Sequence, residues 1–211
     1  MATNQEYIVA ITGASGSIYG KRLLQELLKR GFDISLLISE PGKLVMSHEL
    51  GFTFDEKEAG NEITKWLAVP DAKVRLKYYS DKDLTAPICS GSHVTAGMVI
   101  IPCSMATLGA IANGLSSSLI ERAADVVLKQ SRQLVLVPRE TPLSRIHLKN
   151  LLYAEEAGAK IVPAMPAFYS NPKTIDDMVD FVVGKVLDLL GIRHDLFKRW
   201  EGDSRALVPE I

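Results

Sequence analysis

Two adjacent charged residues, Arg139 and Glu140, follow a short apolar run and are the first candidates for chemistry. The run at residues 134–137 predicts a buried strand, and Pro138 ends it because proline has no N–H for the sheet. Ligands bind at the carboxyl ends of strands in open α/β sheets, so this pair could clamp an anion and transfer a proton. The alternative is a surface ion pair in a loop, and this segment by itself leaves both open.

Small hydroxyl residues follow three other predicted strands, each time at the start of a predicted helix. They lie in the segments 13–17, 39–41 and 104–107, and residues 139–144 form the fourth loop. A parallel sheet brings such loops to one edge, where backbone N–H groups and hydroxyls suit a phosphate. The pattern therefore indicates a phosphorylated cofactor, such as a nucleotide or FMN.

The first of these loops is not a dinucleotide-binding fingerprint. Its glycines at 13, 16 and 20 are spaced GxxGxxxG, whereas the fingerprint is GxGxxG. The Thr-Gly-Ala-Ser opening is similar to that of short-chain dehydrogenases, which place a Tyr and a Lys four residues apart on a helix. The pair at 78 and 82 comes too early, and the pair at 169 and 173 encloses Pro172, which breaks a helix. The spacing argues against a nicotinamide reductase.

Basic residues and one constrained tyrosine are further candidates for binding an anion. Arg122 and Lys129 are seven residues apart on a predicted helix and share a face, and Lys185 lies on the last helix. Tyr169 lies between two prolines that would hold its phenol in place. The plain alternatives are a solvated basic edge for the cations and a core position for the tyrosine.

The cysteines and histidines predict no metal site. Cys89 and Cys103 do not form a CxxC pair, and both fit the role of small core residues. The four histidines show no metal-ligand spacing. We therefore assign no metal and no catalytic histidine.

The composition fits one folded domain. The chain has 211 residues, 47% of them hydrophobic and 23% charged, with a net charge of −1. This balance argues against nucleic acid as a partner. The N-terminus does not look like a targeting segment, and no apolar run approaches membrane-spanning length. We therefore expect a cytoplasmic protein.

Predicted strands and helices alternate along the chain. We expect strands at 7–12, 32–39, 74–79, 98–101, 134–137 and 160–163. Helices are expected at 41–51, 62–69, 104–113, 119–133, 144–157 and 175–190, with another ending at Gly31. The pattern predicts an α/β fold with a doubly wound, mostly parallel sheet of Rossmann or flavodoxin-like type. Residues 1–191 would form the domain, and 192–211 a tail that packs on it or on a neighbouring subunit.

Four motifs resemble the UbiX (Pad1-like) family of flavin prenyltransferases. They are Ile-Thr-Gly-Ala-Ser-Gly at 11–16, Pro-Cys-Ser-Met-Ala-Thr at 102–107, Val-Pro-Arg-Glu-Thr-Pro-Leu at 137–143 and Met-Pro-Ala-Phe-Tyr at 165–169. The second and third are specific, and the similarity covers nearly the whole chain in order. The first alone is not distinctive.

The resemblance implies a metal-independent transferase that binds FMN at the strand ends. A dimethylallyl group would pass from dimethylallyl monophosphate to N5 and C6 of reduced FMN. The product, prenylated FMN, would serve a partner decarboxylase of the UbiD type, in the setting of ubiquinone biosynthesis. The resemblance also implies a homododecamer with active sites at subunit junctions.

The resemblance assigns roles to particular residues. The FMN contacts would be Gly13, Ala14, Ser15, Ser39, Ser104, Met105, Ala106, Thr107 and Arg139. Tyr169 and Lys185 would bind the dimethylallyl phosphate, and the same pocket would be lined by Lys129, Glu140 and, from an adjacent subunit, Ser90, Gly91 and Arg122. The catalytic set would be Ser15, Glu140, Lys129 and Glu49.

These residue types suit the chemistry that the family carries out. Cations stabilise charge that develops on a leaving phosphate, and Glu140 would relay protons. Ser15 would orient the reacting edge of the flavin. A lysine at 185 supplies a point charge and not the fork of an arginine, so it would hold a phosphate with looser geometry.

Two other functions stay open. One is an FMN-dependent decarboxylase that acts on its own substrate, as in related cysteine decarboxylases, which carry a catalytic histidine and a Pro-Ala-Ser-Ala-Asn-Thr type of motif. The other is a flavin storage or delivery protein. Such a protein would need the FMN loops but not Lys129, Glu140, Tyr169 and Lys185 together.

Overall fold

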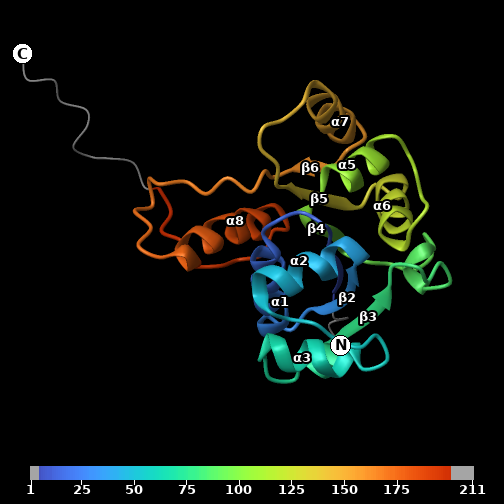
Figure 1. Cartoon of the computed structure of the whole chain (residues 1–211), viewed down its shortest axis with the longest axis horizontal. Coiled ribbons are helices and arrows are strands. Elements are labelled where there is room, and N and C mark those ends of the chain that lie inside the picture. Colours follow the sequence, from blue (N-terminus) through green and yellow to red (C-terminus); the bar gives the residue numbers. More distant parts are fainter. Residues whose placement is uncertain (1–4, 201–211) are drawn as a thin grey trace, which may run out of the picture. The chain divides into compact units, whose positions relative to one another are not determined.

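A parallel sheet forms the centre of the structure (Figure 1). The computed structural model describes residues 5–200, and within them six strands lie in the order β3-β2-β1-β4-β5-β6. They are β1 (Glu6–Ile11), β2 (Asp33–Ile38), β3 (Leu76–Ser80), β4 (Gly97–Cys103), β5 (Gln133–Pro138) and β6 (Lys160–Ile161). Every pairing is parallel. This is the strand order of the Rossmann fold, so the predicted fold class is confirmed.

Helices follow most strands. Their bounds are α1 (Ser17–Lys29), α2 (Glu40–Leu50), α3 (Ala59–Leu67), α4 (Ala72–Arg75), α5 (Met105–Ala112), α6 (Leu119–Lys129), α7 (Arg145–Glu156) and α8 (Ile175–Leu189), with a short 3-10 turn η1 (Pro87–Cys89). None of these helices is long and apolar enough to span a bilayer.

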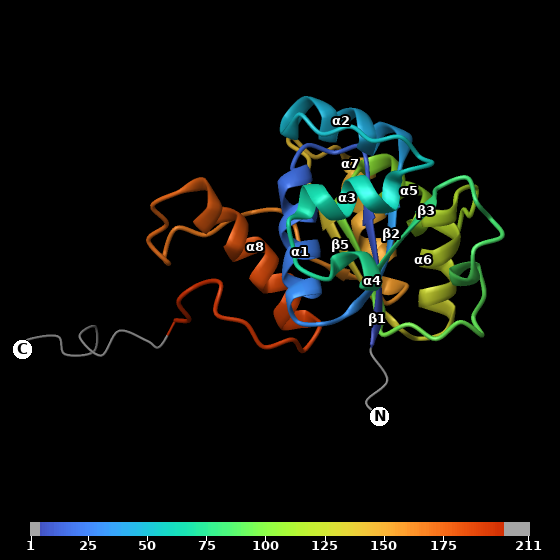
Figure 2. The same cartoon turned by 90° about the horizontal axis from the view of Figure 1, so that it is seen from below.

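The two faces of the sheet are covered by different helices (Figure 2). Ile8 and Ala10 of β1 belong to a core cluster with buried residues of α5, α6 and η1. Ile11 faces the opposite way, because a Cβ at Gly20 of α1 would lie 2.9 Å from its side chain. Alternate residues of a strand point to opposite faces, so one buried strand contributes to both cores.

The chain divides into two compact units, residues 1–164 and 165–211. The first contains the sheet with α1 to α7, and the second contains α8. Residues 192–200 pack on α8 in the second unit, whereas residues 201–211 of the predicted tail lie outside the described residues. The domain boundary expected at residue 191 stays a prediction.

Several predicted boundaries were wrong. α3 spans Ala59–Leu67 and not 62–69, and β6 ends at Ile161 and not at residue 163. α6 ends at Lys129 and not at Gln133, because Ser131 adopts a left-handed conformation with φ 52° and Gln133 already begins β5. Residues 74 and 75 belong to α4, so β3 begins only at Leu76. β4 continues past Pro102 to Cys103, where the register with β5 shifts.

The two cysteines differ in burial. Cys103 is fully buried, as expected, and burial raises the pKa of its thiol to about 12. Cys89 is only partly buried and packs against the core cluster. Within residues 5–200, no three His, Cys, Asp or Glu side chains gather as a metal site.

Candidate functional site

Thr12 joins the strands on either side of the point where the strand order reverses. Its hydroxyl donates to the carbonyl of Pro102 at 2.8 Å and accepts from the amide of Ser104 at 2.8 Å. Its side chain is fully buried. The chain winds outward in opposite directions from β1 and β4, and ligands bind in the crevice between the loops that leave two such strands. The hydroxyl thus fixes the two loops that flank the crevice.

Glycines let the loop after β2 approach the end of β1. A Cβ at Gly13 would lie 2.4 Å from the Cβ of Pro41, and a Cβ at Gly42 would lie 2.6 Å from the carbonyl oxygen of Ile11. Neither space admits a larger residue without a backbone shift. The amide of Ser39 donates to the same carbonyl of Ile11 at 3.0 Å. The loop after β2 is therefore held against the loop after β1.

Hydroxyl residues begin α2 and α5. Ser39 accepts from the amide of Gly42 at 3.1 Å, and Ser104 accepts from the amide of Thr107 at 3.2 Å. The Ser104 and Thr107 hydroxyls lie 3.0 Å apart. The amides in the first turn of a helix have no partner inside it, so the start of α5 presents donors and hydroxyls together.

The start of α1 is different because Glu49, near the end of α2, already binds it. The amides of Gly16 and Ser17 both donate to the Glu49 carboxylate at 2.9 Å. Burial opposes ionisation, but hydrogen bonds from these amides and from the Ser15 hydroxyl hold the pKa of Glu49 below its ordinary value. Glu49 therefore holds the N-terminus of α1 and the adjacent Ser15. Its carboxylate occupies the position at this helix N-terminus where an external anion would otherwise bind.

Arg139 and Glu140 lie directly after β5, as predicted. The guanidinium Nε of Arg139 donates to the carbonyl of Ser15 at 3.2 Å, which links the loops after β5 and β1. Glu140 is half-buried and accepts from the amide of Thr141 at 3.0 Å. Within residues 5–200, Arg139 and Glu140 do not form an ion pair with each other, which argues against the alternative of a surface ion pair between them.

Lys129 lies towards the amino-terminal ends of the strands, whereas Arg139 lies at their carboxyl-terminal ends. α6 begins beside Asp81, which follows β3, since the amide of Leu119 donates to the Asp81 carbonyl at 2.8 Å. Lys129 is the last residue of α6, shortly before β5 begins at Gln133. The length of β5 then separates it from Arg139 by on the order of 17 Å, well beyond the reach of a lysine side chain.

Ser90 and Gly91 also lie towards the amino-terminal end of β5. Arg132, which precedes β5, donates to the carbonyl of Gly91 at 2.6 Å. A Cβ at Gly91 would lie 2.7 Å from the side-chain nitrogen of Gln130. Side chains of the same chain, those of Arg132 and Gln130, therefore pack closely against Gly91.

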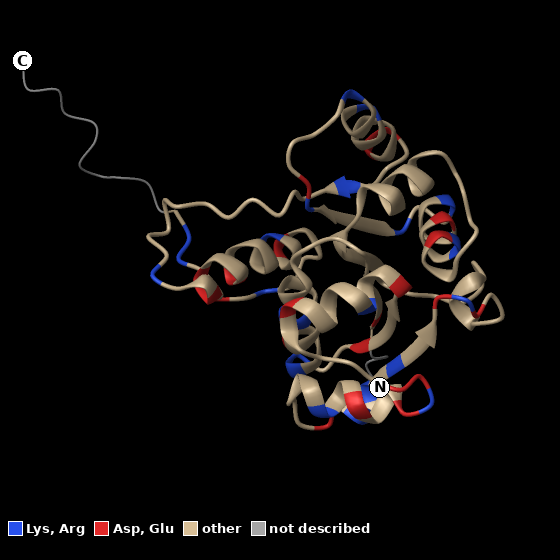
Figure 3. Cartoon of the chain, in the orientation of Figure 1, with Lys and Arg blue, Asp and Glu red and all other residues tan. Residues whose placement is uncertain are grey.

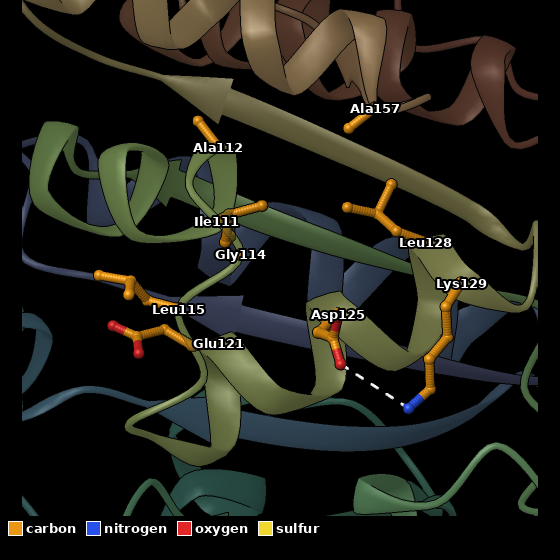
Figure 4. Close-up of a pocket in the computed structure, with 9 residues that line it drawn as sticks. All are labelled: Ile111, Ala112, Gly114, Leu115, Glu121, Asp125, Leu128, Lys129 and Ala157. Atoms are coloured by element: carbon orange, nitrogen blue, oxygen red, sulfur yellow. Dashed lines mark ion pairs between the residues drawn. The ribbon is translucent and has the colours of Figure 1, made fainter.

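Arg122 and Lys129 share a face of α6 with an acidic residue between them. Asp125 pairs with Arg122 at 3.3 Å and with Lys129 at 3.7 Å, and acidic and basic residues alternate along the helix (Figure 3). A pocket of about 350 Å³ beside this face is lined by residues near the ends of α5, α6 and α7, including Leu128, Lys129 and Ala157 (Figure 4). The predicted shared face is confirmed, and both cations are partly neutralised within the chain.

Tyr169 and Lys185 belong to the second unit. The Tyr169 ring is about half exposed, at 51%, and meets the ring of Phe181 edge-on at 5.7 Å. The ammonium of Lys185 lies over the rings of Phe181 and Phe197. The two residues predicted to bind the donor therefore share one aromatic neighbour.

Comparisons with known proteins agree over nearly the whole chain. A family model described as Flavoprotein matches residues 1–187. A curated relative, the flavin prenyltransferase UbiX of Halalkalibacterium halodurans, is 52% identical over 199 residues, which is 94% of each chain. The chain belongs to the UbiX flavin prenyltransferase family.

Two solved structures share the fold at high coverage. One, AnUbiX (PadA1) in complex with FMN and dimethylallyl pyrophosphate, is 37% identical and superposes with a TM-score of 0.83, covering 95% of this chain and 99% of its own. The other is a dodecameric FMN-dependent UbiX-like decarboxylase from Escherichia coli O157:H7, at 40% identity and a TM-score of 0.81, covering 94% and 100%.

The strand-end loops fit the FMN of a UbiX protein. Ser39, Ser104 and Thr107 supply hydroxyls, the start of α5 supplies amides, and Arg139 supplies a cation, all donors that suit a phosphorylated flavin. The space beside Gly13 is closed by Pro41, so a side chain there would displace the loop.

Sequence reasoning missed Thr12, Phe181 and Phe197. A buried threonine at the end of a strand and before a glycine turn was a usable signal for Thr12. The two phenylalanines gave none, because the contact between Phe181 and Phe197 depends on the chain turning back along α8 after Gly191.

Proposed function

We propose that this protein transfers a dimethylallyl group from dimethylallyl monophosphate to reduced FMN. The C–O bond of the donor breaks, bonds form at N5 and C6 of the flavin, and inorganic phosphate leaves. The observation that carries the proposal is the link from Arg139 to Ser15, which brings the specific Arg-Glu motif after β5 onto the loop after β1. A UbiX relative with the same fold binds FMN and a dimethylallyl diphosphate.

The flavin would be held by the loops at the carboxyl ends of β1, β2, β4 and β5. The set proposed from the family is Gly13, Ala14, Ser15, Ser39, Ser104, Met105, Ala106, Thr107 and Arg139. Bound reduced flavin supplies the nucleophilic nitrogen and carbon of the reaction. The N-terminal amides of α5 and the Arg139 guanidinium offset the negative charge of its phosphate.

Ser15, Glu49 and Glu140 would act at the reacting edge. Glu49 accepts hydrogen bonds from the amides of Gly16 and Ser17, so the backbone next to Ser15 would be held in one conformation. Glu140 follows Arg139 directly and is half-buried, which places a carboxylate at the same edge to accept or pass on a proton.

Lys129, Arg122, Ser90 and Gly91 would complete the site of a neighbouring subunit. Lys129 lies towards the amino-terminal ends of the strands, so it does not reach the loops at the carboxyl-terminal ends of the strands in its own chain. In a closed assembly of identical subunits, one chain can lend these residues to the site of the next. The dodecameric relative from E. coli supports an assembly of this kind.

Tyr169 and Lys185 would bind the donor phosphate. A phenol and an ammonium offer one donor hydrogen bond and one point charge to a leaving phosphate. Both would help to offset the charge that develops on the phosphate as the C–O bond breaks.

The product would pass to a decarboxylase of the UbiD type that uses prenylated FMN. This step, and a place in ubiquinone biosynthesis, rest on the family resemblance. The proposal places the protein in the cytoplasm, where reduced flavin and such a partner would be available; no helix of residues 5–200 could span a membrane.

A decarboxylase acting on its own substrate is the second candidate. It is favoured by one observation, namely that the E. coli relative with the same fold is described as an FMN-dependent decarboxylase. The Pro-Cys-Ser-Met-Ala-Thr motif at residues 102–107 differs from the motif of the cysteine decarboxylases, which argues for the transferase.

One experiment separates these functions. The protein is incubated without oxygen with reduced FMN and dimethylallyl monophosphate, and the released flavin is weighed by mass spectrometry. We expect a flavin that is heavier by one dimethylallyl unit. We also expect one equivalent of inorganic phosphate to be released. An unchanged FMN mass would rule out the transferase, and CO₂ released from an added carboxylic acid would favour the decarboxylase.

A further inference from the structure

The chain turns back along α8 immediately after the helix ends. Gly191 adopts a left-handed conformation with φ 70°, and the amide of Ile192 donates to the carbonyl of Leu187 at 2.9 Å. This is the usual way for a helix to end at a glycine. Residues 192–200 then run beside the helix that carries Lys185.

Residues 193–200 are fixed to α8 at two points. A Cβ at Gly184 would lie 2.5 Å from the Phe197 ring and 2.7 Å from the His194 ring, so the segment packs directly on the helix backbone. Asp188 accepts hydrogen bonds from His194 at 3.1 Å and from Arg199 at 2.7 Å. The His194 side chain is completely buried. Gly184 and Asp188 lie one turn apart, so both contacts are on one face of α8.

Lys185 lies on this face, beneath the returning segment. Its ammonium nitrogen is 5.1 Å from the centre of the Phe197 ring and 5.5 Å from the centre of the Phe181 ring. Both distances are within the range of a cation–π interaction. The two rings are 5.1 Å apart, and Phe181 also meets Tyr169. Phe181 is buried, so this pair of rings supports both donor-binding residues.

Aromatic faces hold an ammonium in a way that suits phosphate binding. A carboxylate partner would cancel the charge of Lys185, but none of residues 5–200 forms an ion pair with it, and its ammonium lies over two aromatic rings. The rings attract the cation but leave its charge available to an anion. A lysine side chain loses considerable rotamer entropy when it is immobilised, so holding it in advance favours binding.

We propose that Phe197 is a positioning residue that holds the Lys185 ammonium ready for the phosphate of the donor. Phe181 completes the support from within α8. The inference rests on the proposed function, because it assumes that Lys185 meets the donor. It gives Phe197 a role beyond packing, in the same segment whose Trp200 meets the Tyr169 ring edge-on at 6.0 Å.

The test is a double-mutant cycle in the full-length, FMN-loaded protein. Binding of dimethylallyl monophosphate is measured by calorimetry, alongside KM and kcat, in wild type, Phe197→Leu, Lys185→Met and the double variant. We expect Phe197→Leu to weaken donor binding by about threefold to tenfold, with little change in kcat. In the Lys185→Met background the same substitution should change binding less than about twofold, since it acts through the lysine.

Two further variants control for packing. Phe197→Tyr keeps the ring and should bind the donor as wild type does. Phe54→Leu removes a similar contact, that of Lys43 at 5.7 Å in the first unit, and should leave donor binding unchanged. FMN content, read from absorbance, should be the same in all variants.

The outcomes separate the inference from the proposed function. Equal donor affinity in wild type and Phe197→Leu, or an equal loss with and without Lys185, would refute the positioning role while the transferase stands. Failure of the wild type to bind or consume the donor would refute both.

Discussion

The Nε of Arg139 donates a hydrogen bond of 3.2 Å to the carbonyl of Ser15, across 124 positions of sequence. The two residues follow β5 and β1, which are separated in the sheet by β4. The contact therefore spans the end of β4 and orients the guanidinium along the edge where the flavin is proposed to bind.

Replacing Arg139 with Met should weaken FMN binding. The variant loses a cation near the flavin phosphate and the contact that orients Ser15, so we expect affinity to fall by about tenfold to a hundredfold. Fluorescence titration of FMN measures this. The exposed Arg145 of α7 offers a matched control, since Arg145→Met removes the same charge outside the site. Equal losses in the two variants would contradict a specific role for Arg139.

Glu140→Gln should keep FMN bound but slow turnover. The amide can no longer accept a proton, and loss of a general base costs on the order of a hundredfold or more in rate. Single-turnover rates with pre-bound reduced FMN give the measurement, with Glu155→Gln on α7 as control. If FMN is lost while the rate per bound flavin is unaffected, Glu140 binds the flavin and does not relay protons.

Glu49→Gln should destabilise the protein in a way that depends on pH. The folded-state pKa of Glu49 lies below its ordinary value of 4.5, so the ionised carboxylate contributes stability above pH 4.5. That contribution disappears as the pH falls through the folded-state pKa. We expect a loss of about 1 kcal/mol at pH 7, a small value because the side chain is largely exposed.

Urea unfolding at a series of pH values tests this. The difference in unfolding free energy between wild type and Glu49→Gln should shrink below pH 4.5. A difference that stays constant down to pH 3 would show that the loss does not come from the carboxylate charge.

Thr12→Val should destabilise the strand ends without a change of shape. Valine nearly matches threonine in volume but cannot bond to the Pro102 carbonyl or the Ser104 amide. A buried donor left without a partner costs about 1 to 3 kcal/mol. Thermal unfolding measures the loss, and Thr12→Ser, which keeps the hydroxyl, should recover part of it. A Thr12→Val protein as stable as wild type would show that the two hydrogen bonds of the hydroxyl do not contribute to stability.

Two inactive variants with different substitutions should restore each other's activity when they assemble together. If Lys129 acts in the site of a neighbour, a mixed assembly of Lys129→Met and Glu140→Gln chains contains sites in which both residues are native. Random mixing makes about a quarter of the sites complete. Co-expressed variants should then show turnover well above either variant alone. No recovery in a mixed assembly of normal size would place Lys129 and Glu140 in the same chain's site.

Local chemistry was enough to predict several parts of the site. Ser104 and Ser144 were expected to begin helices, and both accept the hydrogen bond of an N-cap. Arg139 was expected at a strand end because an apolar run and a proline precede it. In each case the signal and the structure lie within a few residues of each other.

Contacts between distant segments could not be predicted in this way. Glu49 binds the amide of Gly16, 33 positions away, and nothing in either segment indicates the other. The end of α6 was misplaced because serine gives little sign of a left-handed conformation at Ser131. The position of Lys129 relative to Arg139 depends on the direction of α6, which emerges only once the strands are ordered.

The Glu49 carboxylate at the start of α1 also bears on which nucleotides this fold can accept. In dinucleotide-binding proteins with this strand order, the pyrophosphate sits on the amides of the first helix. Here those amides already bind a negative charge, so the pyrophosphate of NAD would meet a like charge and would have to displace a bonded carboxylate. A cofactor with a single phosphate, held elsewhere on the edge, avoids that repulsion. One acidic side chain can thus exclude a whole class of cofactors from a fold that commonly binds them.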